Sequence, residues 1–241
     1  MKNLKKKNKI NKITIGLPCY NEEKNIEKSM KDCLNFIVNN KVSNYEILVI
    51  DNNSTDNTLK KINKFKKNKN IKIIKNNKNI FYSGSVGKII SLSKYKEIGI
   101  IDTDGQYIFS DFKKLFLKLY DDNDIVFGFR KNRSDSIFRI LVSKVFNFMA
   151  NIILNSRLKD LNCGIKVLVK PKKFKKLKFK INHANPELFC IYSQKKGKIN
   201  EIEVSHRYRN QGKSIHNVLN LSLSFFEVIN YFVKLRKKYL I

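Results

Sequence analysis

The stretch EIGIIDTDGQY, residues 97–107, runs from apolar residues straight into two acids that are separated by a single threonine. Its first part, 97–102, has the apolar character of a buried strand, so Asp102 and Asp104 fall at or just beyond the strand's carboxyl end. The whole chain carries a formal net charge of +30, which makes two neighbouring carboxylates unusual. They indicate either a polar turn or a site that holds a divalent cation.

Outward from this stretch, strand-type runs alternate with helix-type segments through the first half of the chain. The expected strands are 13–18, 45–50, 71–74, 97–102 and 124–129. The expected helices are 22–38, 58–65, 85–95 and 109–120, the third of them after a glycine-containing loop. This repetition predicts an α/β fold with a mainly parallel sheet flanked by helices. Because such sheets bind ligands at the carboxyl ends of their strands, Asp51 and Asp102 should lie on the same rim.

The pattern changes after residue 135. A long amphipathic helix is expected over 136–155, followed by a short strand over 164–169, a helix near 185–196 and a strand over 199–204. No linker rich in Pro, Gly or Ser interrupts the chain. We therefore expect a basic tail over 1–12, one domain over 13–213, and an amphipathic helix in the C-terminal segment 214–241.

Composition limits the function classes. Hydrophobic residues make up 42% of the 241 residues, enough for a sizeable core. The four cysteines are widely spaced without a CxxC motif, so a reducing compartment is expected and a zinc site is not. The basic N-terminus has no apolar signal-peptide region after it, and no window of about 18 uninterrupted apolar residues occurs. A cytoplasmic protein that is soluble or peripheral to a membrane is the expectation.

The positive charge favours polyanionic partners, which include nucleic acids, anionic membrane surfaces and phosphorylated small molecules. The lysines are spread over the N-terminus, 60–78, 170–180 and the C-terminus, and no nucleic-acid-binding motif accompanies them. A nucleic-acid-binding protein is therefore only a distant alternative.

Three polar motifs follow expected strands, and each has two interpretations. LPCYNEEKNI, 17–26, is either a helix cap with acids in the first turn or a nucleotide-binding loop in which Tyr20 packs on a base or ribose and Glu22 accepts hydroxyl hydrogen bonds. DNNSTDNT, 51–58, is either a capped turn or a loop whose Asp51 recognises the base. In the third motif, Asp102 and Asp104 could converge on Mg²⁺ or Mn²⁺, with Gln106 as a third oxygen ligand.

Taken together and in this order, PCYNEE, VIDNNSTDNT, SGSVGK and IIDTDGQY resemble inverting glycosyltransferases of family two, which have the GT-A fold. In the second half GFRKNRSDSIFRILVSKVFN, DLNCGIKVL and EIEVSHRYRNQGKSIHN look like the polyprenyl-phosphate (dolichyl-phosphate) sugar synthase branch of that family. The resemblance covers residues 13–216. It implies a nucleotide-binding half over 13–106 and an acceptor half over 107–213.

The resemblance implies transfer of a hexose, with inversion, from a donor of the GDP-mannose or UDP-glucose type to a polyprenyl phosphate. The residues it assigns to the nucleotide sugar are Pro18, Tyr20, Glu22, Asp51, Asp102, Thr103, Asp104, Arg130 and Arg209. The implied metal is Mg²⁺ or Mn²⁺, with the ligands Asp102, Asp104 and Gln106. The implied catalytic residues are Asp104, Arg130, Asp160 and Arg209. The residues implied for the acceptor phosphate are Arg133, Arg139, Ser143 and Lys213.

Some positions depart from the family pattern and leave alternatives open. Asn52 stands where a second acid is common, and Asn53 where glycine is common, which affects the expected base specificity. If Asp160 acts as a base, the acceptor is instead a sugar hydroxyl in polysaccharide or glycolipid synthesis.

A lipid-linked acceptor also raises the question of a membrane surface. Segments 137–154 and 218–235 are either core-packing helices or an interface with an anionic membrane. In the second case the side chains expected to enter lipid are Phe146, Phe148, Phe225 and Phe226.

Overall fold

The computed structural model describes residues 9–172, 174, 176–177, 181–208 and 221–241, and the backbone alone for 221–225. One sheet of seven strands forms its centre, in the order β3-β2-β1-β4-β6-β5-β7. The strands are β1 Ile13–Cys19, β2 Tyr45–Asp51, β3 Ile71–Lys75, β4 Glu97–Ile100, β5 Ile125–Phe129, β6 Lys166–Val169 and β7 Ile199–Glu203. The predicted mixed, mainly parallel sheet is confirmed.

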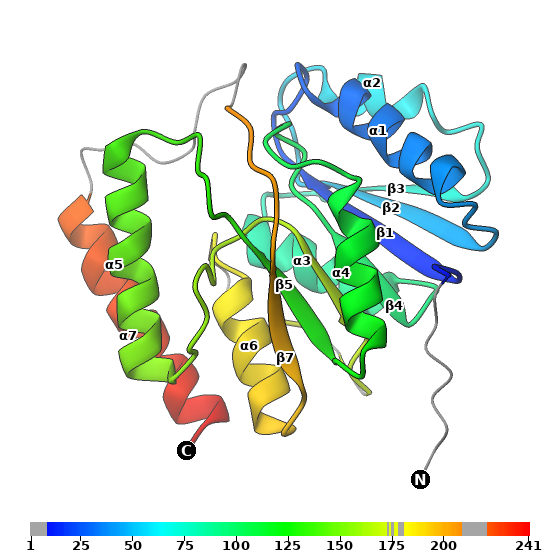
Figure 1. The fold of residues 1–241 in the computed structure, drawn as a ribbon. Helices are drawn as coiled ribbons and strands as arrows, with labels where there is room; N and C mark the ends of the chain where they lie inside the picture. The colour runs from blue at the N-terminus through cyan, green and yellow to red at the C-terminus, as the bar shows by residue number, and fades with distance from the viewer. Residues whose placement is uncertain (1–8, 173, 175, 178–180, 209–220) are drawn as a thin grey trace, which may run out of the picture.

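Helices cover both faces of the sheet (Figure 1). They are α1 Ile26–Asn39, α2 Thr58–Asn63, α3 Phe81–Leu92, α4 Asp111–Tyr120, α5 Ile137–Leu154, α6 Asn185–Gln194 and α7 Leu221–Tyr239. Side chains of α1, α2 and α4 share one buried cluster, and those of α3, α5, α6 and α7 share the other. Strand alternation separates the two clusters, since Ile47 and Val49 of β2 belong to the first and Leu48 and Ile50 to the second.

Strand direction brings the polar motifs to one rim. β1 pairs in parallel with β2 and β4, and β5 in parallel with β7, whereas β6 runs antiparallel between β4 and β5. The carboxyl ends of six strands and the amino end of β6 therefore lie on the same edge of the sheet. As predicted, Asp51 at the end of β2 and Asp102 just after β4 share this rim.

The structure differs from the sequence prediction at two helix starts. The first helix was expected from Glu22, but α1 begins at Ile26, because residues 22–25 form a separate turn in which the Glu22 carbonyl accepts the Asn25 and Ile26 amides. The third helix was expected from Ser85, but α3 begins at Phe81 and contains the presumed glycine loop. The glycine of that loop, Gly84, lies in the first turn of α3, where an added β-carbon would be 2.9 Å from the Ile80 side chain.

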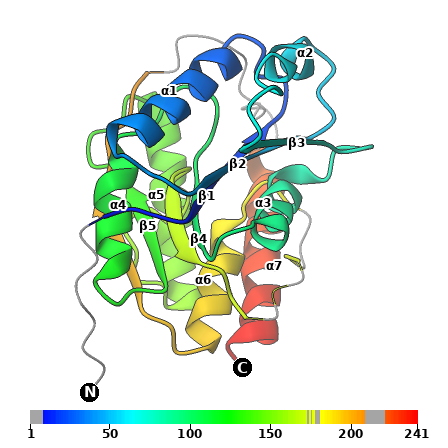
Figure 2. The same ribbon diagram turned by 90° about the vertical axis from the view of Figure 1, so that its right-hand side faces the viewer.

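Helices α5, α6 and α7 form a group beside the β5–β7 edge of the sheet (Figures 1 and 2). In α7, Tyr231, Phe232 and Leu235 are buried, so this helix packs on the core. Phe146 of α5, expected to enter lipid, is buried as well, against the Phe232 ring at 5.1 Å between ring centres. Phe148 and Phe226 are exposed, and the side chain of Phe225 lies outside the described residues.

The expectation of no membrane-spanning helix needs a qualification. By length and composition α5 is apolar enough to cross a membrane, with a mean hydropathy of 1.7 over 18 residues, of which 28% is buried. Core helices of soluble proteins meet the same criterion. Several large apolar side chains of α5 are exposed, among them Ile137, Leu141 and Phe148.

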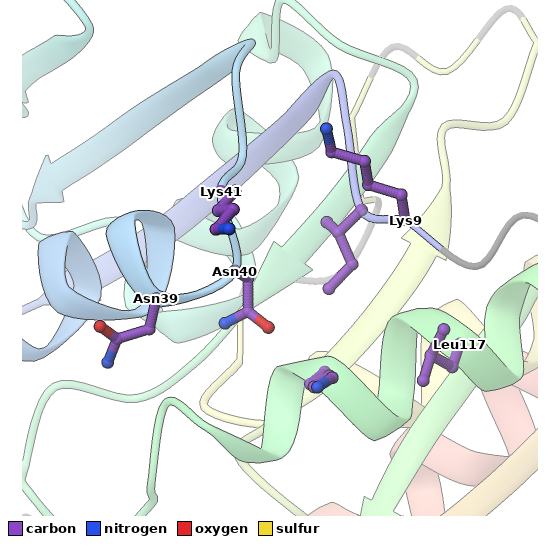
Figure 3. Close-up of a pocket in the computed structure, with 7 residues that line it drawn as sticks. Lys9, Asn39, Asn40, Lys41 and Leu117 are labelled. Carbon is purple, nitrogen blue, oxygen red and sulfur yellow. The ribbon is translucent and has the colours of Figure 1, made fainter.

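A pocket lies between the segment before β1, the end of α1 and α4 (Figure 3). Lys9 and Ile10 precede β1, Asn40 and Lys41 follow α1, and Lys113 belongs to α4. These segments adjoin the amino ends of the parallel strands. The pocket is thus separate from the residues that the sequence singled out.

Candidate active site

The two acids of the DTD stretch have different surroundings. The Asp102 carboxylate accepts a hydrogen bond from the Tyr82 hydroxyl (2.7 Å), which in turn accepts one from the Lys166 ammonium group (3.0 Å). Burial raises the pKa of Asp102, and the positive charge of Lys166 opposes that rise. Burial also lowers the pKa of Lys166, and Asp102 opposes that fall. The first acid therefore belongs to a polar network in which Lys166 is fully buried and Tyr82 and Asp102 are partly buried.

Asp104 lies in a tight turn at the surface of the rim. Gly105 has a φ of 81°, and the Gln106 backbone amide donates to an Asp104 carboxylate oxygen (3.1 Å). The Gln106 side-chain amide donates to the carbonyl of Arg207 (3.3 Å), and the Arg207 amide donates back to the Gln106 carbonyl (2.8 Å). These bonds fix the DTD turn to the segment that follows β7.

Thr103, assigned to the donor by resemblance, is only 2% exposed. Its hydroxyl donates to the Pro18 carbonyl (3.2 Å), and its own carbonyl accepts the Ser29 hydroxyl (3.1 Å). Thr103 therefore ties the DTD turn to β1 through its hydroxyl and to α1 through its backbone carbonyl, and its contact with the donor stays a prediction.

The loops after β1 and β2 are held together by side chains. The amide of Glu22 donates to the Thr58 hydroxyl (2.8 Å), and that of Asn21 to the Ser54 hydroxyl (3.0 Å). Asp51, at the end of β2, is completely buried; one carboxylate oxygen accepts the Ser54 amide (3.2 Å), and the other has no partner among the described residues. A buried carboxylate oxygen without a hydrogen bond is energetically costly. This oxygen of Asp51 could therefore accept a hydrogen bond from a bound ligand.

The structure explains the asparagine at position 52. Its side-chain oxygen accepts the Asn76 side-chain amide (3.1 Å) and the Ile80 backbone amide (2.9 Å), while its own amide donates to Asn79 (2.8 Å). A carboxylate could accept the first two bonds but not donate the third. Asn52 therefore organises the loop between β3 and α3.

Arg130 and Asp160, predicted separately, form a two-point ion pair. The Nε and Nη2 atoms of Arg130 lie 2.6 and 2.9 Å from the two Asp160 oxygens, and both side chains are less than one tenth exposed. Asp160 and Tyr107 help to raise the pKa of Arg130 above its ordinary value, against the opposing effect of burial. The guanidinium group is thus firmly charged and fixed in orientation.

Two further arginines approach the same place through Asp135. The Asp135 carboxylate lies 2.6 Å from Arg133, 3.9 Å from Arg130 and 4.0 Å from Arg139. Three guanidinium groups thus surround two carboxylates, those of Asp135 and Asp160. We call Arg130, Arg133 and Arg139 the arginine cluster. It stands at the amino end of α5, beside the loop that follows β5.

His206 links the arginine cluster to the DTD turn. Its Nδ1 accepts the Ser134 amide (3.3 Å), its carbonyl accepts the Ser134 hydroxyl (2.9 Å), and its ring packs edge-on against Tyr107. Burial lowers the pKa of His206 to about 4, assisted by Arg130. A neutral ring with Nδ1 as acceptor carries its proton on Nε2.

The remaining predicted site residues differ in how exposed their side chains are. Ser143 is 9% exposed, and its hydroxyl is buried without a partner among the described residues, so its role towards an acceptor phosphate stays a prediction. Tyr20 and Glu22 are partly exposed in the loop after β1. Arg209 and Lys213 lie outside the described residues.

The predicted metal ligands fit a cation that arrives with a phosphate group. Among the described residues no three His, Cys, Asp or Glu side chains are placed to hold a metal by themselves. In phosphate-binding sites, however, Mg²⁺ uses one or two carboxylates and takes further ligands from the substrate and water. Asp104, with Asp102 behind it, is a donor set of that kind.

Three residues of the site were not predicted from the sequence. They are Tyr82 and Lys166, which are linked to Asp102, and His206, which lies between the arginine cluster and the DTD turn. Tyr82 was placed in a loop, and only its position in the first turn of α3 brings its hydroxyl to Asp102. Lys166 stands in the DLNCGIKVL motif, and the resemblance gives it no role, although a lysine that begins an apolar strand is a usable signal. His206 had no sequence signal, because its neutral state depends on burial.

Comparison with known proteins agrees with this geometry. The family described as "Glycosyl transferase family 2" matches residues 14–184. An uncharacterised protein of Methanocaldococcus jannaschii is 33% identical over 82% of this chain and 89% of its own. A dolichyl-phosphate beta-glucosyltransferase of Dictyostelium discoideum is 27% identical over 66% of this chain, which spans about half, 54%, of that relative.

Among solved structures, glucosyl-3-phosphoglycerate synthase from Mycobacterium tuberculosis, in complex with Mn²⁺, UDP-glucose and phosphoglyceric acid, superposes with a TM-score of 0.67. The match covers 92% of this chain and 79% of that one, at 14% identity. At this identity the likeness establishes the fold, and it agrees with the GT-A architecture expected from the motifs.

Proposed function

The chain belongs to glycosyltransferase family 2, and from this premise we propose that it transfers a hexose from a UDP-sugar to a polyprenyl phosphate at a membrane surface. Three parts of the proposal rest on separate observations. They are the class of acceptor, the nucleotide of the donor, and the surface on which the acceptor is presented.

The ion pair between Asp160 and Arg130 bears on which class of acceptor the protein uses. A sugar hydroxyl needs a base to remove its proton, and Asp160 was the candidate base. Both of its oxygens accept hydrogen bonds from Arg130, at 2.6 and 2.9 Å, so the carboxylate is already occupied by the guanidinium group. A phosphate monoester is already ionised near neutral pH and needs no base. The ion pair therefore favours a phosphate acceptor over the alternative hydroxyl acceptor.

The arginine cluster suits such an acceptor. Arginine binds phosphate through two parallel N–H groups, and three guanidinium groups meet only two carboxylates here. We propose that Arg133 and Arg139 bind the acceptor phosphate and that Arg130, held by Asp160, faces the donor diphosphate. Lys213 and Arg209 remain proposed phosphate ligands on sequence grounds.

For the donor we propose uridine as the nucleoside. Asp51 has one buried oxygen without a partner among the described residues, and uracil offers one ring N–H to such an acceptor, whereas guanine offers two neighbouring donors. Because Asp51 is completely buried, a side chain near it must move when the base enters. Pro18, Tyr20 and Glu22 stand beside it as further proposed contacts.

In the proposed reaction an acceptor phosphate oxygen attacks the anomeric carbon while the bond from that carbon to the diphosphate oxygen breaks, which inverts the configuration. Arg130 would stabilise the negative charge that develops on the departing diphosphate. A divalent cation, Mg²⁺ or Mn²⁺, held by Asp104 and Asp102 with Gln106 nearby, would neutralise the same charge. The protein would orient the two phosphate groups and keep them from repelling each other.

A membrane surface is proposed from the exposed side of α5. We call the set of apolar residues on it the α5 apolar face: Ile137, Phe138, Leu141, Val142, Val145, Phe148 and Ile152, each at least 38% exposed. It adjoins the arginine cluster, and exposed basic residues stand on α5 and at the end of α7. Since Phe146, Ala150 and Leu154 are buried on its other side, we propose that α5 lies along the inner face of the cytoplasmic membrane.

The test is release of nucleoside diphosphate from a panel of UDP- and GDP-sugars with Mn²⁺ or Mg²⁺, with and without a short polyprenyl phosphate. We expect release from a UDP-hexose that depends on the lipid phosphate and is lost in Asp104→Ala. Donor use that is indifferent to polyprenyl phosphate would favour the hydroxyl acceptor. Preference for a GDP-sugar would contradict the uridine assignment.

A further inference from the structure

Lys166 is a charged side chain in the interior of the sheet. It begins β6, the antiparallel strand between β4 and β5, and is 0% exposed. Its ammonium nitrogen lies 3.0 Å from the Tyr82 hydroxyl and 5.3 Å from the centre of the Tyr82 ring. Because a buried ammonium group is costly unless it is paired, its presence calls for a local explanation.

The direction of the hydrogen bonds supplies that explanation. An ammonium group can only donate and a carboxylate only accept, so the chain runs from Lys166 through the Tyr82 hydroxyl to Asp102. The three residues come from three different segments, namely β6, α3 and the turn after β4. The Tyr82 hydroxyl thus connects the Lys166 ammonium group to the carboxylate of Asp102, and the two hydrogen bonds fix its orientation.

The other side of Asp102 is closed by backbone. A β-carbon added at Gly164 would lie 2.1 Å from the second carboxylate oxygen and 2.6 Å from the carboxyl carbon. Gly164 in turn is fixed by its amide, which donates to the Tyr107 hydroxyl (2.8 Å). The carboxylate therefore sits between a hydroxyl and a glycine backbone, and its plane is set from both sides.

We infer that Lys166 is a positioning residue that acts through Tyr82 to hold the Asp102 carboxylate in the orientation required when a nucleotide-bound cation enters the site. Lys166 itself does not touch the donor. The inference rests on the proposed function to the extent that the ligand is a nucleoside diphosphate with a divalent cation, and it adds a role for two residues that the motif comparison left unassigned.

The experiment measures Mn²⁺ binding by electron paramagnetic resonance in the presence of UDP and without any acceptor. Lys166→Met removes the charge at similar length, and Tyr82→Phe removes the connecting hydroxyl while keeping the ring. Partners of metal ligands typically affect metal affinity about 10- to 100-fold, and we expect a loss of that size for both variants. Lys166→Arg, which restores the positive charge, should recover part of the affinity.

Lys170→Met is the matched control. Lys170 also anchors β6 to α3, by donating to the carbonyls of Ser91 (2.8 Å) and Ser93 (3.2 Å), but it lies beyond the other end of the strand. We expect this variant to lower the thermal unfolding temperature and leave Mn²⁺ affinity in the presence of UDP unchanged. Thermal unfolding of every variant separates a lost fold from a lost binding site.

The inference is overturned if folded Lys166→Met or Tyr82→Phe binds Mn²⁺ and UDP as tightly as the wild type, or if Lys170→Met loses affinity equally. Should Lys166→Met not fold, the milder Tyr82→Phe decides the question. A wild type that binds Mn²⁺ with UDP but makes no lipid product contradicts the proposed function and leaves this inference standing. The two failures are therefore distinguishable.

Discussion

Arg130 and Asp160 show how a single pair of residues sets the chemistry of the rim. With side chains 9% and 7% exposed, each leaves a buried charge behind when the other is removed. We expect Arg130→Ala and Asp160→Ala each to lower the free energy of unfolding by about 3–5 kcal/mol. The double variant should cost less than the sum by about 1–3 kcal/mol, because neither charge is then left alone.

Urea unfolding of the two single variants and the double variant measures this coupling. The exposed pair Lys28 and Asp32, at 66% and 39%, is the control, and its coupling should stay under about 1 kcal/mol. Strict additivity of the Arg130 and Asp160 effects would contradict the assignment of Asp160 as the partner of Arg130.

His206 should make the stability of the protein depend on pH. In the unfolded chain the pKa of its ring is about 6.5. In the folded protein burial and the nearby Arg130 and Arg133 lower this pKa to about 4, although Asp135 and Asp160 act in the opposite direction. Between these values the unfolded chain binds more protons, so stability falls as the pH drops from 6.5 towards 4. Allowing for solvent screening, we expect a loss of about 1–3 kcal/mol.

The measurement is urea unfolding at several pH values for the wild type and for His206→Asn. The asparagine oxygen can still accept the Ser134 amide but does not titrate in this range. The variant should show a shallower fall between pH 6.5 and 4. An identical pH dependence in both proteins would mean that His206 does not carry this effect.

At the scale of elements, the proposed membrane contact of α5 can be tested directly. We expect replacement of Leu141, Phe148 and Ile152 by serine to weaken binding to anionic vesicles on the order of 100-fold, at about 1 kcal/mol for each partly inserted side chain. These residues are 58–64% exposed, so the free energy of unfolding should change little. Vesicle flotation of each variant gives the partition coefficient.

Val38→Ser with Leu92→Ser is the control, because both residues are exposed apolar side chains on other helices, at 71% and 40%. This control should bind vesicles as the wild type does. Equal binding by the α5 variant would mean that the α5 apolar face is covered by something other than lipid.

The elements also show where sequence patterns suffice. Apolar runs located each strand of the described part of the chain to within a few residues, because burial in the sheet requires apolar side chains. Helix α3 began four residues earlier than expected, since Gly84, which signals a loop in the sequence, lies within the helix. That shift hid Tyr82, and with it the link between Lys166 and Asp102.

At the scale of the whole molecule, alternation of strands and helices was enough to predict that Asp51 and Asp102 lie on one rim of the sheet. The pairing of Arg130 with Asp160 could not be predicted, because it depends on how β5 and β6 lie side by side in opposite directions. The burial of Ser143 and Thr103 was likewise invisible in motifs, which record residue types without their exposure.

The net charge of +30 gives the molecule a field that reaches beyond any one site. If it supports attachment to an anionic membrane, binding to vesicles that contain anionic lipid should weaken steeply as salt rises from about 0.05 to 0.5 M, while the apolar part of the binding persists. Vesicle sedimentation across this range measures it. Binding that is indifferent to both salt and anionic lipid would remove the electrostatic part of the proposal.

The most direct test of the central claim is detection of the product. Purified protein is incubated with a UDP-hexose, Mn²⁺ and either a short polyprenyl phosphate or the matching polyprenol, and the lipid phase is examined by mass spectrometry. The account predicts a polyprenyl phosphate hexose from the phosphate and no product from the polyprenol. Transfer to the polyprenol or to an added sugar, with none to the lipid phosphate, would contradict it.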